Sequence, residues 1–216
     1  MAHIHLEDGT LALFWVAVWW IAAILIIGGS VLWLRSVKKI DGRLVTLAGF
    51  CTAALFVVFL FEIPVAGGVH LSMTPLVGIL TGPAVGCLIV FIINILAAAI
   101  GHGGWSMIGA NVLVNVTEVV VAGALYYLFS KAVKSPFVCA ATATFSGLVC
   151  GNGVMVAIIL ISGIQGVTQS ADQVLAGLSL LVAINLAVAV IESVITGFMV
   201  AYLVHIRPDL LKRRDA

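Results

Sequence analysis

The sequence predicts an all-α, polytopic membrane protein of about seven transmembrane helices, one of them short or re-entrant. The first observation is composition: 63% of the 216 residues are hydrophobic and 9% are charged, which is too much apolar surface for a water-soluble domain of this length. The second is a series of apolar runs, most of them near the ~20 residues that a helix needs to cross a bilayer core. The third is that these runs lack the alternation of a transmembrane β-barrel. Helices are expected, because lipid offers no partner to exposed backbone groups.

Seven apolar runs follow one another along the chain. They lie at 11–34, 44–62, 72–82, 83–100, 107–129, 136–162 and 174–205. We expect a single membrane-embedded domain over 1–216. It would comprise an external N-terminal segment (1–10), a helical bundle (11–205) and a basic cytoplasmic tail (206–216). The first run is not expected to be a cleaved signal, because histidine and acidic residues rather than basic ones precede it.

The basic residues set the expected orientation in the plasma membrane. They fall into three segments: Arg35, Lys38, Lys39 and Arg43; Lys131 and Lys134; and Arg207, Lys212, Arg213 and Arg214. Since cytoplasmic loops carry an excess of Lys and Arg, these segments are expected inside and the N-terminus outside. An even number of crossings must then separate Arg43 from Lys131. A break at Gly82-Pro83 supplies the fourth crossing, so the 72–82 run is expected to be tilted, half-buried or partly re-entrant.

The chain has little room for a soluble catalytic domain. It contains no G-x-x-x-x-G-K-[ST] motif for binding ATP and no H-E-x-x-H or G-x-S-x-G motif. We therefore expect no enzyme activity, no permanent cofactor and no nucleic-acid partner.

The external N-terminus, Met1-Ala2-His3-Ile4-His5, carries the groups for a nitrogen-only metal site. An α-amine, the next backbone amide and a nearby imidazole form fused chelate rings, and this near-planar set suits Ni²⁺ and Cu²⁺ and accepts Co²⁺. If Met1 is removed, Ala2 supplies the amine and His3 supplies an amide and its ring. If Met1 remains, the Ala2 amide joins the set. His5 stays open as a ligand, a supporting group or a solvated residue, and a wholly solvated tail is the alternative for the segment.

His70, in the external loop after the second run, is the candidate for the missing fourth ligand. The neighbouring glycines allow this loop to fold tightly. The alternative is a histidine at a helix end that bonds to water or to Ser72. Glu62, at the outer end of the second run, is either a boundary residue or a group that supports the ligands.

Four polar residues within the later runs are candidates for a role in the site. Asn111 and Asn115 are four residues apart and share a helix face, so they either hold the N-terminal segment or the 63–71 loop, or bond between helices. Glu118 and Glu192 are the ionisable residues deep in the runs, which makes them functional candidates. A proton relay, an ion path, a partner contact and a protonated structural carboxyl all stay open for them.

Together these blocks resemble the CbiM/NikM family, the cobalt and nickel substrate-specific (S) components of energy-coupling factor transporters. The resemblance covers most of the chain. It rests on the N-terminal His-Ile with Asp8-Gly9, on Gly68-Val69-His70-Leu71-Ser72, on Gly82-Pro83, and on Gly103-Gly104 through Gly109-Ala110-Asn111.

The resemblance implies a transported Co²⁺ or Ni²⁺ ion as substrate. Its ligands would be the amine of Ala2 after loss of Met1, the amide nitrogen and ring of His3, and the ring of His70. The family begins Met-His, whereas Ala2 intervenes here, so the other possibility is that Met1 stays and the Ala2 amide joins. The implied partners are a membrane-embedded coupling (T) subunit, a pair of cytoplasmic ATPases and a small two-span accessory subunit.

Three rival functions stay open at this point. They are a substrate-binding subunit for an organic vitamin, a membrane metalloenzyme that uses Glu118, Glu192 or a histidine-bound metal, and a purely structural membrane subunit. Cobalt and nickel are not distinguished, because they are neighbours in the Irving–Williams order.

Overall fold

The computed structural model describes residues 8–37, 42–60, 62–63, 69–101, 103–164 and 171–211. Within these ranges the chain forms α1 (Leu13–Val37), α2 (Gly42–Leu60), α3 (Thr74–Thr81), α4 (Pro83–Ala99), α5 (Ile108–Ala132), α6 (Pro136–Ser162) and α7 (Ala171–Ile206). Two short 3-10 helices, η1 (Trp105–Met107) and η2 (Pro208–Leu210), and two strands, β1 (Glu62–Ile63) and β2 (Val69–His70), complete it. The α-helices match the predicted runs in order, which confirms the all-α class. The strand pair was not expected.

The lengths of the helices divide them into spanning and partial segments. Among the described residues, α1, α2, α5 with η1, α6 and α7 are long and apolar enough to cross a membrane, and α4 is a shorter apolar helix. The eight residues of α3 extend only about 12 Å, less than half of a ~30 Å bilayer core. The predicted break is confirmed: Gly82 has φ 85°, and Pro83 begins α4, where its missing N–H costs no hydrogen bond.

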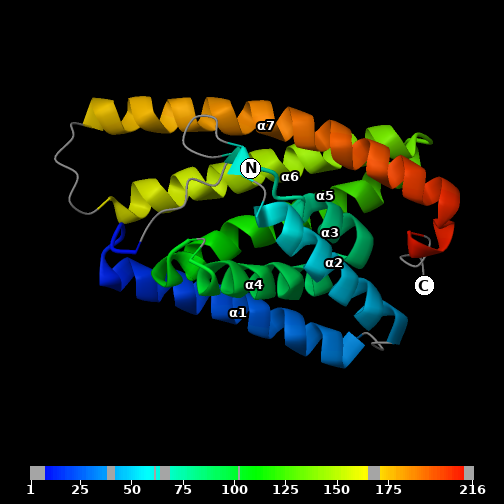
Figure 1. Ribbon diagram of the computed structural model, residues 1–216, viewed down its shortest axis with the longest axis horizontal. Helices are drawn as coiled ribbons and strands as arrows, with labels where there is room; N and C mark the ends of the chain where they lie inside the picture. Colours follow the sequence, from blue (N-terminus) through cyan, green and yellow to red (C-terminus); the bar gives the residue numbers. More distant parts are fainter. Residues whose placement is uncertain are drawn as a thin grey trace.

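Helix α5 is the centre of the bundle. It packs against α1, α3, α4 and α6. Half of its most apolar stretch is buried, against 11% for α1 and 17% for α2 and α7. In Figure 1, α7 and α6 lie along one side of the molecule and α1 along the other, with α4 between them. The outer helices therefore present broad apolar faces to lipid, while α5 supplies the interior.

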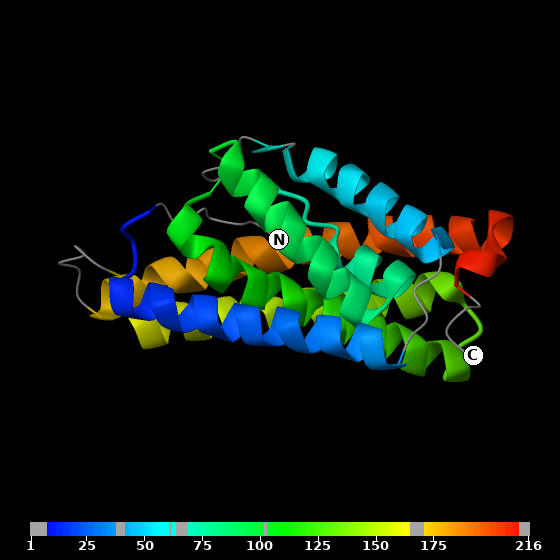
Figure 2. The ribbon, with the colours of Figure 1, turned by 90° about the horizontal axis from the view of Figure 1, so that it is seen from below.

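The three basic segments share one end of the molecule. Arg43, at the start of α2, forms an ion pair with Asp209 of η2, and Arg207 also bonds to Asp209. Figures 1 and 2 show the α5–α6 connection, which carries Lys134, at this same end. The chain thus leaves this end along α2, returns through residues 69–73 and α3, leaves again along α4, and returns along α5. That path satisfies the parity that the sequence required.

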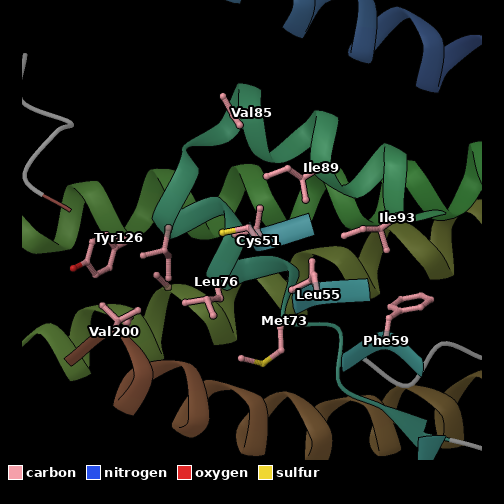
Figure 3. Packing of buried hydrophobic residues seen from close by; sticks show 14 of the residues in the cluster. Cys51, Leu55, Phe59, Met73, Leu76, Val85, Ile89, Ile93, Tyr126 and Val200 are labelled. Atoms are coloured by element: carbon pink, nitrogen blue, oxygen red, sulfur yellow. The ribbon is translucent and has the colours of Figure 1, made fainter. Parts of the chain in front are cut away.

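A hydrophobic cluster joins α2, α3, α4, α5 and α7. Figure 3 labels its members from these helices and from the turn before α3: Cys51, Leu55, Phe59, Met73, Leu76, Val85, Ile89, Ile93, Tyr126 and Val200. The close approach of α1 to α5 depends on glycine, because a Cβ at Gly109 would lie 2.6 Å from the Trp20 backbone nitrogen. Beside α3, a wholly apolar pocket of about 380 Å³ is lined by residues of α2, α3 and α7, among them Leu47, Leu76 and Leu203.

Candidate functional site

The first polar contact of the site joins the start of the described chain to the loop before α5. Asp8 Oδ1 accepts hydrogen bonds from the Ser106 backbone N–H at 2.8 Å and from the Ser106 hydroxyl at 2.6 Å. These bonds, the hydroxyl first, lower the pKa of Asp8 below its ordinary value, because they favour the ionised carboxylate. A Cβ at Gly104 would lie 2.8 Å from Asp8 Cγ, so the loop closes on Asp8 only with glycine there. We call this contact the Asp8 clasp.

The clasp brings together two of the sequence blocks singled out above, Asp8-Gly9 and Gly103-Gly104. The predicted ligands Ala2 and His3, and the alternates Met1 and His5, lie outside the described residues.

His70 lies in the short strand pair that follows α2. The strands are antiparallel, with Glu62 opposite His70 and Ile63 opposite Val69. The backbones of Glu62 and His70 are therefore neighbours, although their side chains are outside the described part of the chain.

A small cavity lies between the end of α2 and the glycine loop that closes on Asp8. It has about 10 Å³ of space, roughly that of one water molecule, and is lined by Phe59 at the end of α2 and by Gly103, Gly104 and Asn111. The end of α2 that leads into the strand pair, the glycine loop and the start of α5 thus meet at one place. Asn111 lines this cavity. Its predicted role, whether toward the N-terminal segment, the 63–71 loop or another helix, stays a prediction.

Deeper in the bundle, α5 carries a column of polar groups. Asn115 and Glu118 follow Asn111 at intervals of four and three residues, so all three lie along one side of the helix. Asn115 is 1% exposed and Glu118 is fully buried. Asn115 Oδ1 and Glu118 Oε1 have no hydrogen-bond partner among the described residues. These two oxygens, one helical turn apart, can therefore accept hydrogen bonds from a donor outside the described residues.

The turn between β2 and α3 fixes the two buried glutamates. Glu192 of α7 accepts hydrogen bonds from the backbone N–H of Ser72 at 3.1 Å and from that of Met73 at 2.9 Å. The Ser72 hydroxyl is 3.1 Å from Glu192 Oε1 and 3.2 Å from the Thr74 hydroxyl. Thr74 is in turn hydrogen-bonded to Glu118 Oε2. Four side chains thus form one connected chain of oxygens from α5 to α7.

This connection was missed at the level of sequence. Its position suggests Ser72 only as a partner of His70, and nothing in the sequence suggests a role for Thr74. The available signal was a pair of hydroxyl residues at the start of a short apolar run. Their contacts with residues 44 and 120 positions away could not be read from local spacing.

The family comparison covers both the clasp and the glutamates. The family model CbiM, described as the cobalt uptake substrate-specific transmembrane region, matches residues 5–210. The chain belongs to the CbiM family. Its family makes it a transport protein of the membrane and a component of metal uptake.

Individual relatives match along nearly the whole chain. A cobalt transport protein CbiM of Sorangium cellulosum is 28% identical over 97% of this chain and 95% of its own length. A cobalt transport protein CbiM of Geobacter sulfurreducens is 28% identical over 97% of this chain, which spans 62% of that relative. A relative from Archaeoglobus fulgidus, 29% identical over 98% of this chain and 69% of its own length, bears the name of a fused nickel transport protein, NikMN.

The CbiM-family fold also matches solved structures. The crystal structure of a transition metal transporter superposes with a TM-score of 0.77 over 94% of this chain and 93% of its own, at 19% identity. The agreement supports the arrangement of helices described above.

The described ranges contain no cluster of the side chains that most often bind metal ions. No group of three or more His, Cys, Asp or Glu residues is close enough there to hold an ion.

Proposed function

We propose that this chain is the substrate-capture subunit of an ATP-driven cobalt or nickel importer. The Co²⁺ or Ni²⁺ substrate is bound by the amine of Ala2 after removal of Met1, the amide nitrogen and ring of His3, and the ring of His70. If Met1 is retained, the Ala2 amide completes the set. The relatives that bear the names of cobalt and nickel transport proteins support this class of substrate.

The Asp8 clasp is the observation that carries the proposal. It fixes the chain five residues after His3, and five residues reach at most about 17 Å. The same loop contributes Gly103 and Gly104 to the small cavity that Phe59 of α2 also lines. The strand pair with His70 begins three residues after Phe59. These contacts support a site at which the N-terminal segment and the strand pair meet.

The open acceptors of α5 fit a docked N-terminal segment. A chain start supplies an amine and successive backbone N–H groups, which are donors without helical partners of their own. Asn115 Oδ1 and Glu118 Oε1 are buried acceptors that need donors. If the N-terminal segment inserts over α5, its donors and these two acceptors become hydrogen-bond partners. Asn111, one turn before Asn115, lines the small cavity beside them.

The groups around the ligands have supporting roles in this proposal. The backbone of Glu62 pairs with that of His70 and holds the strand in place. Ser72, two residues further on, is anchored to Glu192. The imidazole of His70 is thereby presented from a short segment that is fixed on both sides.

Metal capture requires the loss of protons. The α-amine, with an ordinary pKa of ~8, and the His3 amide must both be deprotonated when they bind the ion. Capture is therefore expected to weaken as pH falls. The near-planar nitrogen set favours Ni²⁺ and Co²⁺ over Zn²⁺, which prefers tetrahedral sites.

The partners in this proposal are a membrane-embedded coupling subunit, a cytoplasmic ATPase pair and a small two-span accessory subunit. The face of α2 that carries Gly49 and Ala53 supports a contact with the coupling subunit. Both residues are exposed, and nothing lies within 4 Å of a Cβ built on Gly49. A surface of small residues lets a second helix approach closely in a membrane.

The test is metal titration of purified protein, combined with intact-mass measurement of the N-terminus. His3→Ala, His70→Ala and the insertion of one residue before Ala2 should each weaken Co²⁺ and Ni²⁺ binding at least tenfold. His205→Ala is the matched control, because His205 lies near the end of α7, at the basic end of the molecule. Unchanged affinity in all three variants would contradict the proposed site.

A further inference from the structure

The apolar pocket beside α3 lies between α2 and α7, two helices that are exposed to lipid. Its lining includes the buried residues Leu55 of α2 and Val77 of α3. Phe50 of α2 and Tyr202 of α7 also line it, and they are 72% and 66% exposed. The pocket therefore opens sideways from the bundle into the membrane instead of lying closed among the helices. Its volume of about 380 Å³ falls in the range of small-molecule binding sites.

The pocket reaches the end of the molecule where the basic segments meet. On α2 its lining begins at Leu47, one turn after Arg43. On α7 it extends to Leu203, one turn before Arg207. About 6 Å along each helix thus separates an arginine from the apolar lining. From there the lining continues along α2 for about 12 Å, as far as Leu55.

The two arginines at this end share one acidic residue. Arg43 forms an ion pair with Asp209, and Arg207 donates to both oxygens of the same carboxylate at 3.0 and 3.1 Å. Two cations and one anion leave a net positive charge, and the two guanidiniums carry more N–H donors than one carboxylate can accept. The arginine side chains are 51% and 54% exposed. An anion at this end would therefore meet forked donors that suit a phosphate group.

A phospholipid combines the two properties that this place can recognise, because its phosphate is joined directly to hydrocarbon chains. A helix of a partner subunit is the other kind of occupant for an apolar groove in a membrane. The surface assigned above to the coupling subunit lies elsewhere on α2. Gly49 follows the lining residue Leu47 by two positions, which is about 200° around the helix, and Ala53 shares the face of Gly49. A contact on that face leaves the pocket open.

We propose that the pocket binds an acyl chain of an anionic phospholipid, whose phosphate lies between Arg43 and Arg207. The chain extends along α2 toward Leu55, over the buried residues of α3. Tyr202 at the rim is typical of a residue at the membrane interface, where its ring meets hydrocarbon and its hydroxyl meets polar groups. The lipid thus joins α2 to α7 at their basic ends. The strand pair with His70 follows the opposite end of α2, so the lipid site is separate from the proposed metal site.

Native mass spectrometry of the purified full-length protein tests the proposal. The probes are phosphatidylglycerol, which is anionic, and phosphatidylcholine with identical acyl chains. One basic charge near a membrane surface favours an anionic lipid by about fivefold, so phosphatidylglycerol should bind about fivefold more tightly. This preference should shrink as the salt concentration is raised. Glycerol phosphate, which has the phosphate without the chains, should not compete. No metal is involved, so failure here is distinct from failure of the metal site.

Charge variants test the headgroup end of the site. Arg43→Gln and Arg207→Gln each remove one positive charge and should abolish the preference for phosphatidylglycerol. Asp209→Asn removes the competing carboxylate and should raise the preference to about 25-fold. All three variants break an ion pair, so damage to the fold would weaken binding in each of them. The opposite sign expected for Asp209→Asn separates recognition of the phosphate from stability.

A bulky side chain tests the hydrocarbon end of the site. Ala54 is exposed and lines the pocket, so Ala54→Trp places an indole in the space of the acyl chain. This variant should bind phosphatidylglycerol at least tenfold more weakly. Val45→Trp is the matched control, because Val45 is 58% exposed and lies nine residues before Ala54, about two and a half turns, on the opposite side of α2. The control should bind as the wild type does.

Four results would overturn the proposal. The first is equal binding of the two lipids by the wild type, which would mean that the phosphate is not recognised. The second is unchanged binding of phosphatidylglycerol by Ala54→Trp, which would place the lipid outside the pocket. The third is full competition by glycerol phosphate, which would indicate a site for small anions. The fourth is loss of the coupling subunit from Ala54→Trp with lipid binding retained, which would assign the pocket to a partner helix.

Discussion

Gly151 and Gly153 of α6 provide a sharp test of the packing around Glu118. A Cβ at Gly151 would lie 2.6 Å from Glu118 Oε1, whereas ordinary contacts begin near 3.4 Å. The carboxyl would have to retreat by about 0.8 Å, but it is fully buried and bonded to Thr74. Gly151→Ala should therefore cost about 1–3 kcal/mol, the usual range for overpacking a tight interior. In a chain of this size each kcal/mol lowers Tm by about 2–4 °C.

Gly153→Ala is the matched control, since it makes the same change two residues away on the same helix. Nothing lies within 4 Å of a Cβ at Gly153, and alanine forms helix better than glycine by up to about 1 kcal/mol. Thermal unfolding in one detergent should show Gly151→Ala lowering Tm by about 2–12 °C and Gly153→Ala leaving it unchanged or slightly raised. Equal shifts for the two variants would show that α6 does not approach Glu118 as described.

Three further predictions concern contacts elsewhere in the chain. The Ser106 hydrogen bonds lower the pKa of Asp8. The stability that they contribute is therefore fully present at a pH above 3.8, the ordinary pKa of an Asp, and is lost as the pH falls through the lowered pKa. The difference in Tm between wild type and Asp8→Asn should shrink over that acid range, and a constant difference would contradict the clasp. Trp19 Nε1 donates to the Ser162 hydroxyl at 2.8 Å, so Trp19→Phe and Ser162→Ala should each cost about 0.5–1.5 kcal/mol, and the double variant less than their sum. Gly49→Leu should leave metal affinity and Tm unchanged but reduce co-purification of the coupling subunit; full recovery of that subunit would argue against the α2 face.

The features that were predicted from the sequence depend on local chemistry. Gly82-Pro83 marked the break between α3 and α4, because a proline begins a helix readily and a glycine accepts a positive φ. The distribution of Lys and Arg placed three segments together, and the Arg43–Asp209 ion pair joins two of them. The rarity of charge in the apolar runs singled out Glu118 and Glu192.

The features that were not predicted depend on contacts between distant residues. Asp8 and Ser106 are 98 positions apart, and the Ser72 backbone meets Glu192 across 120 positions. Periodicity states which face of a helix is apolar, but it does not state the rotation and height at which that face meets another helix. The strand pair was missed for a related reason, since two residues on each side give no alternation to detect.

The short helix α3 gives this membrane protein a mechanical link between its two surfaces. Residues 70–83 run from the outer strand pair to the proline that starts α4, and α3 forms the rigid middle of that path. Before α3 the chain is held by the hydrogen bonds of Ser72 and Met73 to Glu192, and along one flank of α3 lies the apolar pocket of about 380 Å³. Seven of the eight residues of α3 are buried, and a Cβ at Gly78 would lie 2.9 Å from the Val119 carbonyl carbon of α5, so α3 is packed too closely to move independently of α5. Any shift of the turn before α3 would thus be passed to α5, the central helix of the bundle.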